Sequence, residues 1–172
     1  MEIKYMTLLN DNRSATAMNS GIKKIARAIS IEEIIALENL YNGGNQFPAA
    51  LRELLLLAGG YCYVLDYGLN DSQAEMQLTS REYLTFLGRN RTISRPFYVI
   101  DVYNAGDQFL FVYLDEGKDD PTVYEAFLDG DLYNRDNWIN VVTSPLTALI
   151  NSRIKRFLSS DNPFDNGIKS SI

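Results

Sequence analysis

Residues 97–128 read FYVIDVYNAGDQFLFVYLDEGKDDPTVYEAFL, and this stretch decides the fold class. It contains three runs rich in aromatic and β-branched residues, at 97–103, 108–114 and 122–128. Turn-forming Asn, Gly, Asp and Pro residues separate the runs, a pattern that is typical of an antiparallel meander. The middle run is apolar on both faces, as expected for a central strand.

Upstream of the meander, a helix is predicted over 30–41. Ser30 and Glu33 have the spacing of a capping box, in which each side chain binds a free backbone N–H at the helix start. Glu38 falls inside the apolar arc of this helix, where an unpaired carboxylate is unfavourable. We therefore expect Glu38 to accept hydrogen bonds from backbone N–H groups of a neighbouring loop. The apolar residues of that arc are Ile31, Ile34, Ile35, Leu37 and Tyr41.

A second helix is predicted within FPAALRELLLLAGG, residues 47–60. Pro48 opens it at a position where the missing N–H is not needed, and Gly59 and Gly60 end it. The leucines of this segment share a broad apolar face. The pattern therefore predicts that this helix is the most buried one in the chain.

The segments at the two ends of the chain have weaker patterns. We expect 1–29 to form an N-terminal extension, with an edge strand over 1–9 and a short helix over 22–29. Residues 159–172 are polar and rich in helix breakers, which is typical of a flexible tail. Other expected elements are a strand at 61–67, a helix at 81–87 capped by Thr79 or Ser80, a strand at 138–142 and a final helix at 144–158.

The composition excludes several classes of protein. The 172 residues include 16 basic and 22 acidic residues and no histidine, which gives a net charge of −6. A chain this acidic is not expected to bind nucleic acid or anionic lipid as its main partner. The lack of histidine excludes Ser-His and Cys-His catalytic pairs and all His-containing metal sites. The single cysteine, Cys62, lies in an apolar run and is expected to be a buried hydrophobic residue.

Motifs for catalysis and cofactor binding are also missing from the sequence. The glycine pairs at 43–44 and 59–60 follow helices, whereas phosphate-binding loops place glycines before a helix. The acidic turn at 115–120 lacks the ligand spacing of an EF-hand. There is no G-x-S-x-G motif and no apolar run long enough to span a membrane. The apolar stretch at 1–13 is short for a signal peptide, so we expect none. We therefore expect a cytoplasmic protein that is not an enzyme and holds no metal or cofactor.

The acidity is concentrated in one part of the chain. Residues 101–136 contain ten acidic and two basic residues, a net charge of −8. A surface of one sign attracts an oppositely charged partner and speeds its docking, although acidic turns also serve solubility alone. The candidate partner-binding residues in the turns are Asp115, Glu116, Asp119, Asp120, Asp129 and Asp131.

The strands offer an alternative contact surface. Strict alternation places Asp101 on one face with Val99 and Tyr103, and it places Glu125 on one face with Phe127. Such a face would combine acidic and aromatic side chains, as protein interfaces do, although a covered sheet face has the same composition. Tyr103 and Glu125 are therefore the second set of candidate partner-binding residues.

The order of these elements resembles the SUKH superfamily, which contains bacterial immunity proteins and fungal cell-wall-synthesis regulators of the Smi/Knr type. The resemblance is carried by IEEIIALE at 31–38 and by the Pro-initiated helix and Gly-Gly turn of 47–60. It covers about residues 30–158, and Ala58 stands where the family often has Asn. The resemblance implies a single α+β domain, with a mostly antiparallel sheet packed by helices.

The resemblance also implies a function without catalysis. Bacterial members of the family neutralise a toxin, often a nuclease or deaminase, by binding it directly. An acidic surface suits this role, because nucleases have basic substrate-binding clefts. The family's recurrent Glu and Pro correspond to Glu38 and Pro48, which we interpret as structural, together with Gly59 and Gly60. The alternative is an intracellular scaffold or regulatory protein, as in the fungal members.

Overall fold

The computed structural model describes residues 2–128, 137–160 and 162–164. The predicted meander is confirmed, because four antiparallel strands pair with one another in sequence order. The fourth is the short strand predicted near the last helix. The strands are β3 (Phe97–Tyr103), β4 (Gln108–Tyr113), β5 (Val123–Phe127) and β6 (Ile139–Thr143).

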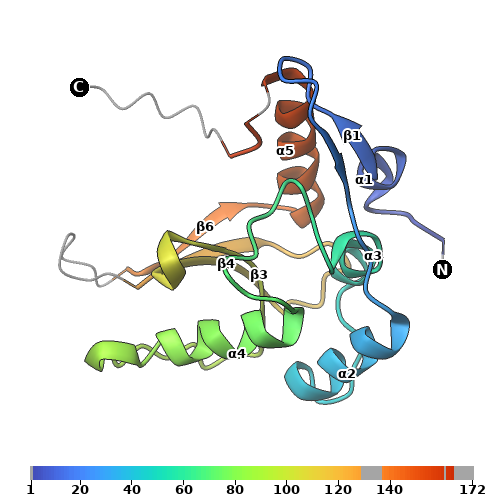
Figure 1. Cartoon of the computed structure of the whole chain (residues 1–172). Helices are drawn as coiled ribbons and strands as arrows, with labels where there is room; N and C mark the ends of the chain where they lie inside the picture. The colour runs from blue at the N-terminus through green and yellow to red at the C-terminus, as the bar shows by residue number, and fades with distance from the viewer. Residues whose placement is uncertain (1, 129–136, 161, 165–172) are drawn as a thin grey trace, which may run out of the picture.

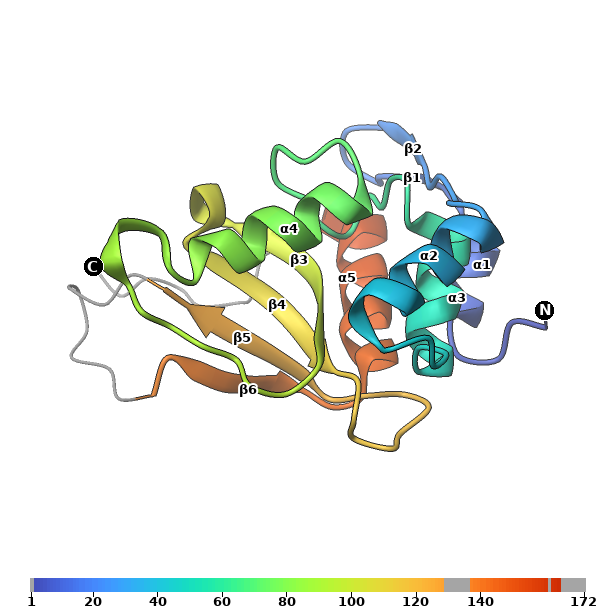
Figure 2. The same ribbon diagram turned by 90° about the horizontal axis from the view of Figure 1, so that it is seen from below.

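Helices cover both faces of this sheet. The helix α4 (Gln73–Tyr83) lies along one face, and α5 (Leu146–Ser160) stands on the other (Figure 1). The view from below has α4 in front of the sheet (Figure 2). The larger core lies between α5, the sheet and the N-terminal half of the chain, and a smaller aromatic core lies under α4. The fold is therefore a single α+β domain with an antiparallel sheet, as predicted.

The helix α2 (Ile31–Tyr41) begins with the predicted capping box. The hydroxyl of Ser30 accepts a 3.1 Å hydrogen bond from the N–H of Glu33, and the Glu33 carboxylate accepts one of 2.9 Å from the N–H of Ser30. The buried arc of the helix is narrower than predicted, since Ile31 and Ile35 are 38% and 45% exposed. This helix therefore keeps apolar side chains at the surface.

The buried Glu38 connects α2 to the helix α3 (Ala49–Ala58). Its carboxylate accepts a 2.8 Å hydrogen bond from the N–H of Phe47, directly before Pro48, the N-cap of α3. The Nε of Arg52 lies 2.8 Å from the same carboxylate oxygen. The expected hydrogen bond from a neighbouring loop is therefore confirmed, and a cation adds to it.

We expect Glu38→Gln to lower the free energy of unfolding by about 1–2 kcal/mol, because it removes the charge that faces Arg52. Glu32→Gln on the exposed side of the same helix is the matched control, with an expected change below about 0.5 kcal/mol. Urea unfolding followed by circular dichroism measures both variants. Equal losses in the two variants would contradict the structural role of Glu38.

The helix α3 is buried over most of its length and ends at two glycines, as predicted. A Cβ atom on Gly59 would lie 2.7 Å from the carbonyl oxygen of Leu55. A Cβ atom on Gly60 would lie 3.0 Å from the carbonyl oxygen of Ala28. Both glycines are therefore required by the close approach of the backbone at this turn.

The N-terminal segment differs from the prediction. The edge strand over 1–9 and the helix over 22–29 are both wrong. The chain instead forms α1 (Thr7–Asp11) followed by a hairpin of β1 (Ser14–Thr16) and β2 (Lys23–Ile25). The helical spacing of isoleucines in this segment was misleading, because these side chains do not share a buried face.

Two features explain how this segment folds. Gly21 adopts a left-handed φ of 66°, which allows the tight turn of the hairpin. Ile22 and Ile25 remain 53% and 57% exposed, whereas Met6 and Leu9 are fully buried in the main core. The N-terminal segment is therefore integrated in that core.

Residues 62–65 are buried, but the run at 61–67 does not form the predicted strand. Among the described residues, this run makes only isolated bridges, from Tyr61 to Arg27 and from Tyr67 to Val102. A turn lies between the two bridges. The β-like composition of this run thus reflects its burial in the core and not its backbone conformation.

Cys62 is buried within this run, as predicted. Burial raises the pKa of its thiol to about 12, because the thiolate would lie in an apolar environment. We expect the native protein to react with a disulfide reagent such as DTNB at pH 8 at least roughly a hundredfold more slowly than the urea-unfolded protein. Similar rates for the native and unfolded protein would contradict this burial.

The helix predicted at 81–87 is also wrong, because α4 begins earlier, at Gln73. Its N-cap is Ser72, and neither Thr79 nor Ser80 caps a helix. The hydroxyl of Ser72 accepts a 3.1 Å hydrogen bond from the N–H of Glu75. Leu87 has a left-handed φ of 55°, which is incompatible with a continuous helix through that residue.

Candidate functional site

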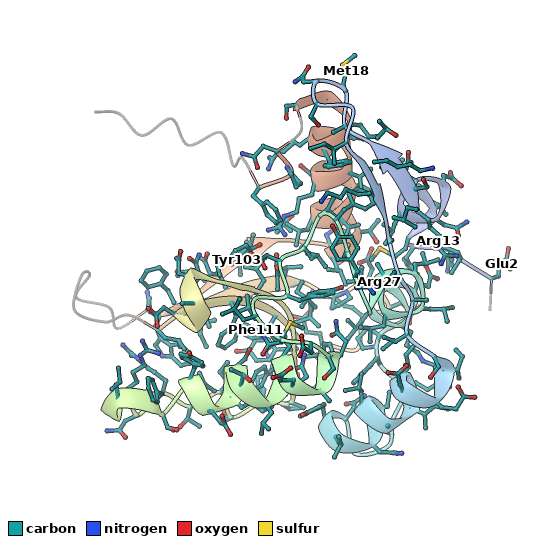
Figure 3. All side chains as sticks on the ribbon, viewed as in Figure 1. Glu2, Arg13, Met18, Arg27, Tyr103 and Phe111 are labelled. Atoms are coloured by element: carbon teal, nitrogen blue, oxygen red, sulfur yellow. The ribbon has the colours of Figure 1, made fainter. Side chains whose placement is uncertain are left out.

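A β-bulge in β3 determines which side chains face α5. Val99 pairs with Phe111, but Asp101 pairs with Leu110, so one extra residue interrupts the alternation. Val99 stays in the core under α4, whereas Asp101 turns to the α5 side. The prediction that Asp101 and Val99 share a face is therefore wrong. Tyr103 lies on the α5 side of the sheet and Phe111 on the α4 side (Figure 3).

Asp101 is fully buried and is the centre of an ionic cluster. It accepts hydrogen bonds from Arg153 Nη1 at 2.6 Å, from the N–H of Asp66 at 2.6 Å and from the hydroxyl of Tyr103. Arg153 also donates to Tyr103 and to the carbonyl of Val64. Burial raises the pKa of the Asp101 carboxyl to about 7, although Arg153 and the hydrogen bonds lower it. The cluster connects β3 to α5 through its buried hydrogen bonds.

An open cavity of about 250 Å³ lies beside this cluster, between the sheet and α5. Two of the predicted contact residues, Tyr103 and Glu125, line it together. Glu125 accepts a hydrogen bond from the side chain of Gln108, and Phe164 places its ring against Tyr103. Phe164 belongs to the segment predicted as a flexible tail, and this described part of it packs on the domain. The described residues of the lining supply acidic and aromatic groups, and none of them supplies a hydroxyl or thiol of Ser, Thr or Cys.

The acidic turn at 115–120 projects from one end of the sheet, between β4 and β5 (Figure 2). Glu116 accepts hydrogen bonds from the N–H of Thr122 at 3.1 Å and from the hydroxyl of Tyr124 at 2.8 Å. Burial opposes ionisation here, but these hydrogen bonds outweigh it and lower the pKa of Glu116. Glu116 therefore fixes the conformation of the turn.

Asp119 and Asp120 also bind parts of the same chain. The hydroxyl of Tyr5 donates to the Asp119 carboxylate at 3.1 Å, and the N–H of Ala50 donates to the Asp119 carbonyl at 2.9 Å. The carboxylate of Asp120 accepts a 3.1 Å hydrogen bond from the N–H of Thr147 in the first turn of α5. Asp119 remains exposed, whereas Asp120 is half-buried.

The negative charge of the meander is partly compensated within the fold. Arg95 forms a bidentate ion pair with Asp115, at 2.6 Å for the shortest contact, and this hydrogen bonding lowers the pKa of Asp115. Arg89 lies 2.5 Å from Asp107. Four acidic residues of the described meander form ion pairs with a basic side chain: Asp101 with Arg153, Asp107 with Arg89, Asp115 with Arg95, and Glu116 with Lys118. The charge counted along the sequence therefore overstates the charge at the surface.

The other residues singled out in the sequence are two further acidic candidates and the four residues predicted to be structural. Asp129 and Asp131 lie outside the described residues. Glu38 lies on α2 and contacts the residue before Pro48 at the start of α3, and Gly59 and Gly60 follow the end of α3. The contacts described for these residues are internal to the fold.

Glu53 is another buried carboxylate that holds the fold together, and the sequence analysis did not predict its role. It is 3% exposed and accepts hydrogen bonds from three consecutive backbone N–H groups, those of Lys4, Tyr5 and Met6, at 2.9, 2.7 and 2.8 Å. The sequence did contain one indication of this role, because Glu53 is the acidic residue of a helix that is apolar except for Arg52 and Glu53. Its partners are close to the N-terminus, so the spacing along the sequence did not indicate them.

No group of three or more Cys, Asp or Glu side chains within the described residues is arranged to hold a metal ion. No helix in the described part of the chain has the length and apolar character needed to cross a membrane. The chain matches no protein-family model, no curated protein and no solved structure with which it was compared.

Proposed function

We propose that this chain is a non-enzymatic protein-binding module of the immunity type, which acts in the cytoplasm. In this proposal it neutralises a toxin domain of the nuclease or deaminase class by covering the basic surface with which the toxin binds its substrate. The family resemblance carried by residues 31–38 and 47–60 supports a binding function without catalysis. The acidic surface favours neutralisation of a toxin over a regulatory scaffold, since it suits a basic partner.

The observation that carries the proposal is the rigid acidic turn at 115–120. Glu116 and Asp120 fix the backbone of the turn, while Asp115 and Asp119 keep exposed carboxylates. A loop that is already ordered loses little conformational entropy on binding. The exposed charge of Asp119 accelerates association with a partner of opposite charge.

The experiment is co-expression of this chain with the toxin domain encoded in the neighbouring reading frame. We expect growth to be restored and a stable complex to be isolated. Asp119→Asn should lower the association rate by roughly two- to fivefold and reduce its salt dependence, because an exposed charge acts mainly on the encounter. Glu32→Gln, which removes an exposed charge elsewhere, is the control and should leave the rate unchanged.

Continued growth arrest in the presence of well-expressed, folded chain would contradict neutralisation. A complex that forms with unchanged kinetics and salt dependence in Asp119→Asn would contradict the assignment of the acidic turn.

A further inference from the structure

A groove separates α2 from the start of α4. The two helices lie next to each other at the base of the molecule (Figure 1), and the groove between them encloses about 410 Å³. The turn at 59–60 forms part of its lining. Its apolar side chains among the described residues are Ala28, Ile29, Ala36, Leu37, Leu40 and Ala74.

The flank of α2 that faces this groove is only partly buried. The helix buries Ile34, Leu37 and Glu38, whereas Leu40 is 69% exposed. Leu40 and Ala36 lie one turn apart on the same flank. Covering Leu40 with an apolar side chain of another molecule would remove this exposed apolar surface from water, which favours binding.

The described residues that line the groove include two carboxylates and one cation. Glu33 lies on the α2 wall and Asp71 on the α4 wall, and both are exposed. Glu33 already caps its helix, but no hydrogen bond or ion pair of the Asp71 carboxylate is found among the described residues. Arg27 is the cation among the described residues that line the groove. Negative charge around an apolar floor complements a segment that is apolar on one side and basic on the other.

We propose that this groove receives a basic amphipathic helix of the partner, with apolar side chains on Ile29 and Leu40 and basic side chains facing Glu33 and Asp71. The inference rests on the proposed function and adds a second contact surface and the chemistry of the partner segment. Helices commonly bind in apolar grooves in this way. A second copy of the chain is a poorer occupant, because it carries a net charge of −6 and would bring like charges together.

The test uses the full chain and a synthetic 14-residue amphipathic helix of leucine and lysine as the probe. Titration followed by NMR should give saturable binding, with shifts at Ile29, Ala36, Leu40 and Ala74. Leu40→Gln should weaken binding about tenfold, because it removes one leucine from the apolar contact. Ile35→Gln is the matched control, since Ile35 is also exposed on α2 but lies on the opposite flank.

A charge comparison completes the test. The same peptide with glutamate in place of lysine should not bind. Asp71→Asn should weaken binding of the lysine peptide by roughly two- to threefold, whereas Glu82→Gln at the far end of α4 should not. Circular dichroism of Leu40→Gln should match that of the wild type, because the side chain is exposed.

Three results would overturn the proposal. They are NMR shifts centred on residues 115–120, binding by Leu40→Gln as tight as by the wild type, and binding of the glutamate peptide as tight as that of the lysine peptide. The peptide titration involves no toxin. Failure of toxin neutralisation with normal peptide binding would therefore reject the proposed function, and the reverse result would reject the groove.

Discussion

Replacing Arg153 with methionine is expected to lower the free energy of unfolding by about 3–5 kcal/mol at pH 8, because it leaves a buried carboxylate without its cation. Arg153 and Asp101 are 5% and 0% exposed, and their ion pair measures 2.6 Å. Arg153 also donates to Val64 and Tyr103, so three groups lose a donor at once. Urea unfolding monitored by circular dichroism measures the loss.

The loss should be smaller at pH 5 than at pH 8. Burial raises the pKa of Asp101 to about 7 in the folded protein, above its usual value of 3.8. The folded state therefore holds this proton more tightly than the unfolded state. The contribution of that proton to stability is complete below pH 3.8 and is lost as the pH rises through about 7. Without Arg153 the pKa rises further, so protonation relieves the variant at pH 5.

Lys155→Met is the matched control, because Lys155 is exposed two residues away on the same helix. Its expected effect is below about 0.5 kcal/mol at both values of pH. A loss in Arg153→Met that equals this control, or that does not change with pH, would contradict the buried ion pair.

The meander and the helices α2 and α3 could be predicted because their signals are local. Ser30 and Glu33 are three residues apart, and the turn residues of 97–128 directly adjoin the strands they connect. In such elements, hydrogen-bond partners and apolar faces are set by neighbours in sequence. The structure confirms each of them.

The ionic cluster could not be predicted, because it depends on contacts far apart in sequence. Arg153 binds Asp101 from a helix 52 residues away. The β-bulge that turns Asp101 toward α5 has no reliable signature in the sequence. Strict alternation correctly placed Asp101 on one face with Tyr103 but wrongly placed it with Val99. The surface charge was overestimated for the same reason, since Arg89 and Arg95 pair with acids of the meander across the fold.

Glu53→Gln is expected to lower the free energy of unfolding by about 2–3 kcal/mol, because hydrogen bonds to a buried charge are worth more than those to a neutral amide. A glutamine offers one acceptor oxygen where the carboxylate receives three N–H donors, and its own NH₂ group would face those donors. Met6, one of the three donors, is fully buried in the main core. Loss of these hydrogen bonds should therefore lower the stability of the whole domain. Urea unfolding measures it.

Hydrogen exchange then distinguishes a local anchor from a general loss of stability. In Glu53→Gln the amides of residues 4–12 should exchange faster than in the wild type by a larger factor than those of β4, because the carboxylate binds the N-terminal segment directly. Glu82→Gln, at an exposed position of α4, should change neither stability nor exchange. A uniform acceleration over both regions would mean that Glu53 stabilises the whole core without a specific role at the N-terminus. Unchanged exchange at residues 4–12 would contradict the three hydrogen bonds. Faster exchange at residues 4–12 than at β4 would establish that a side chain in the centre of α3 determines where the first residues of the chain lie. Local sequence patterns do not encode such a long-range constraint.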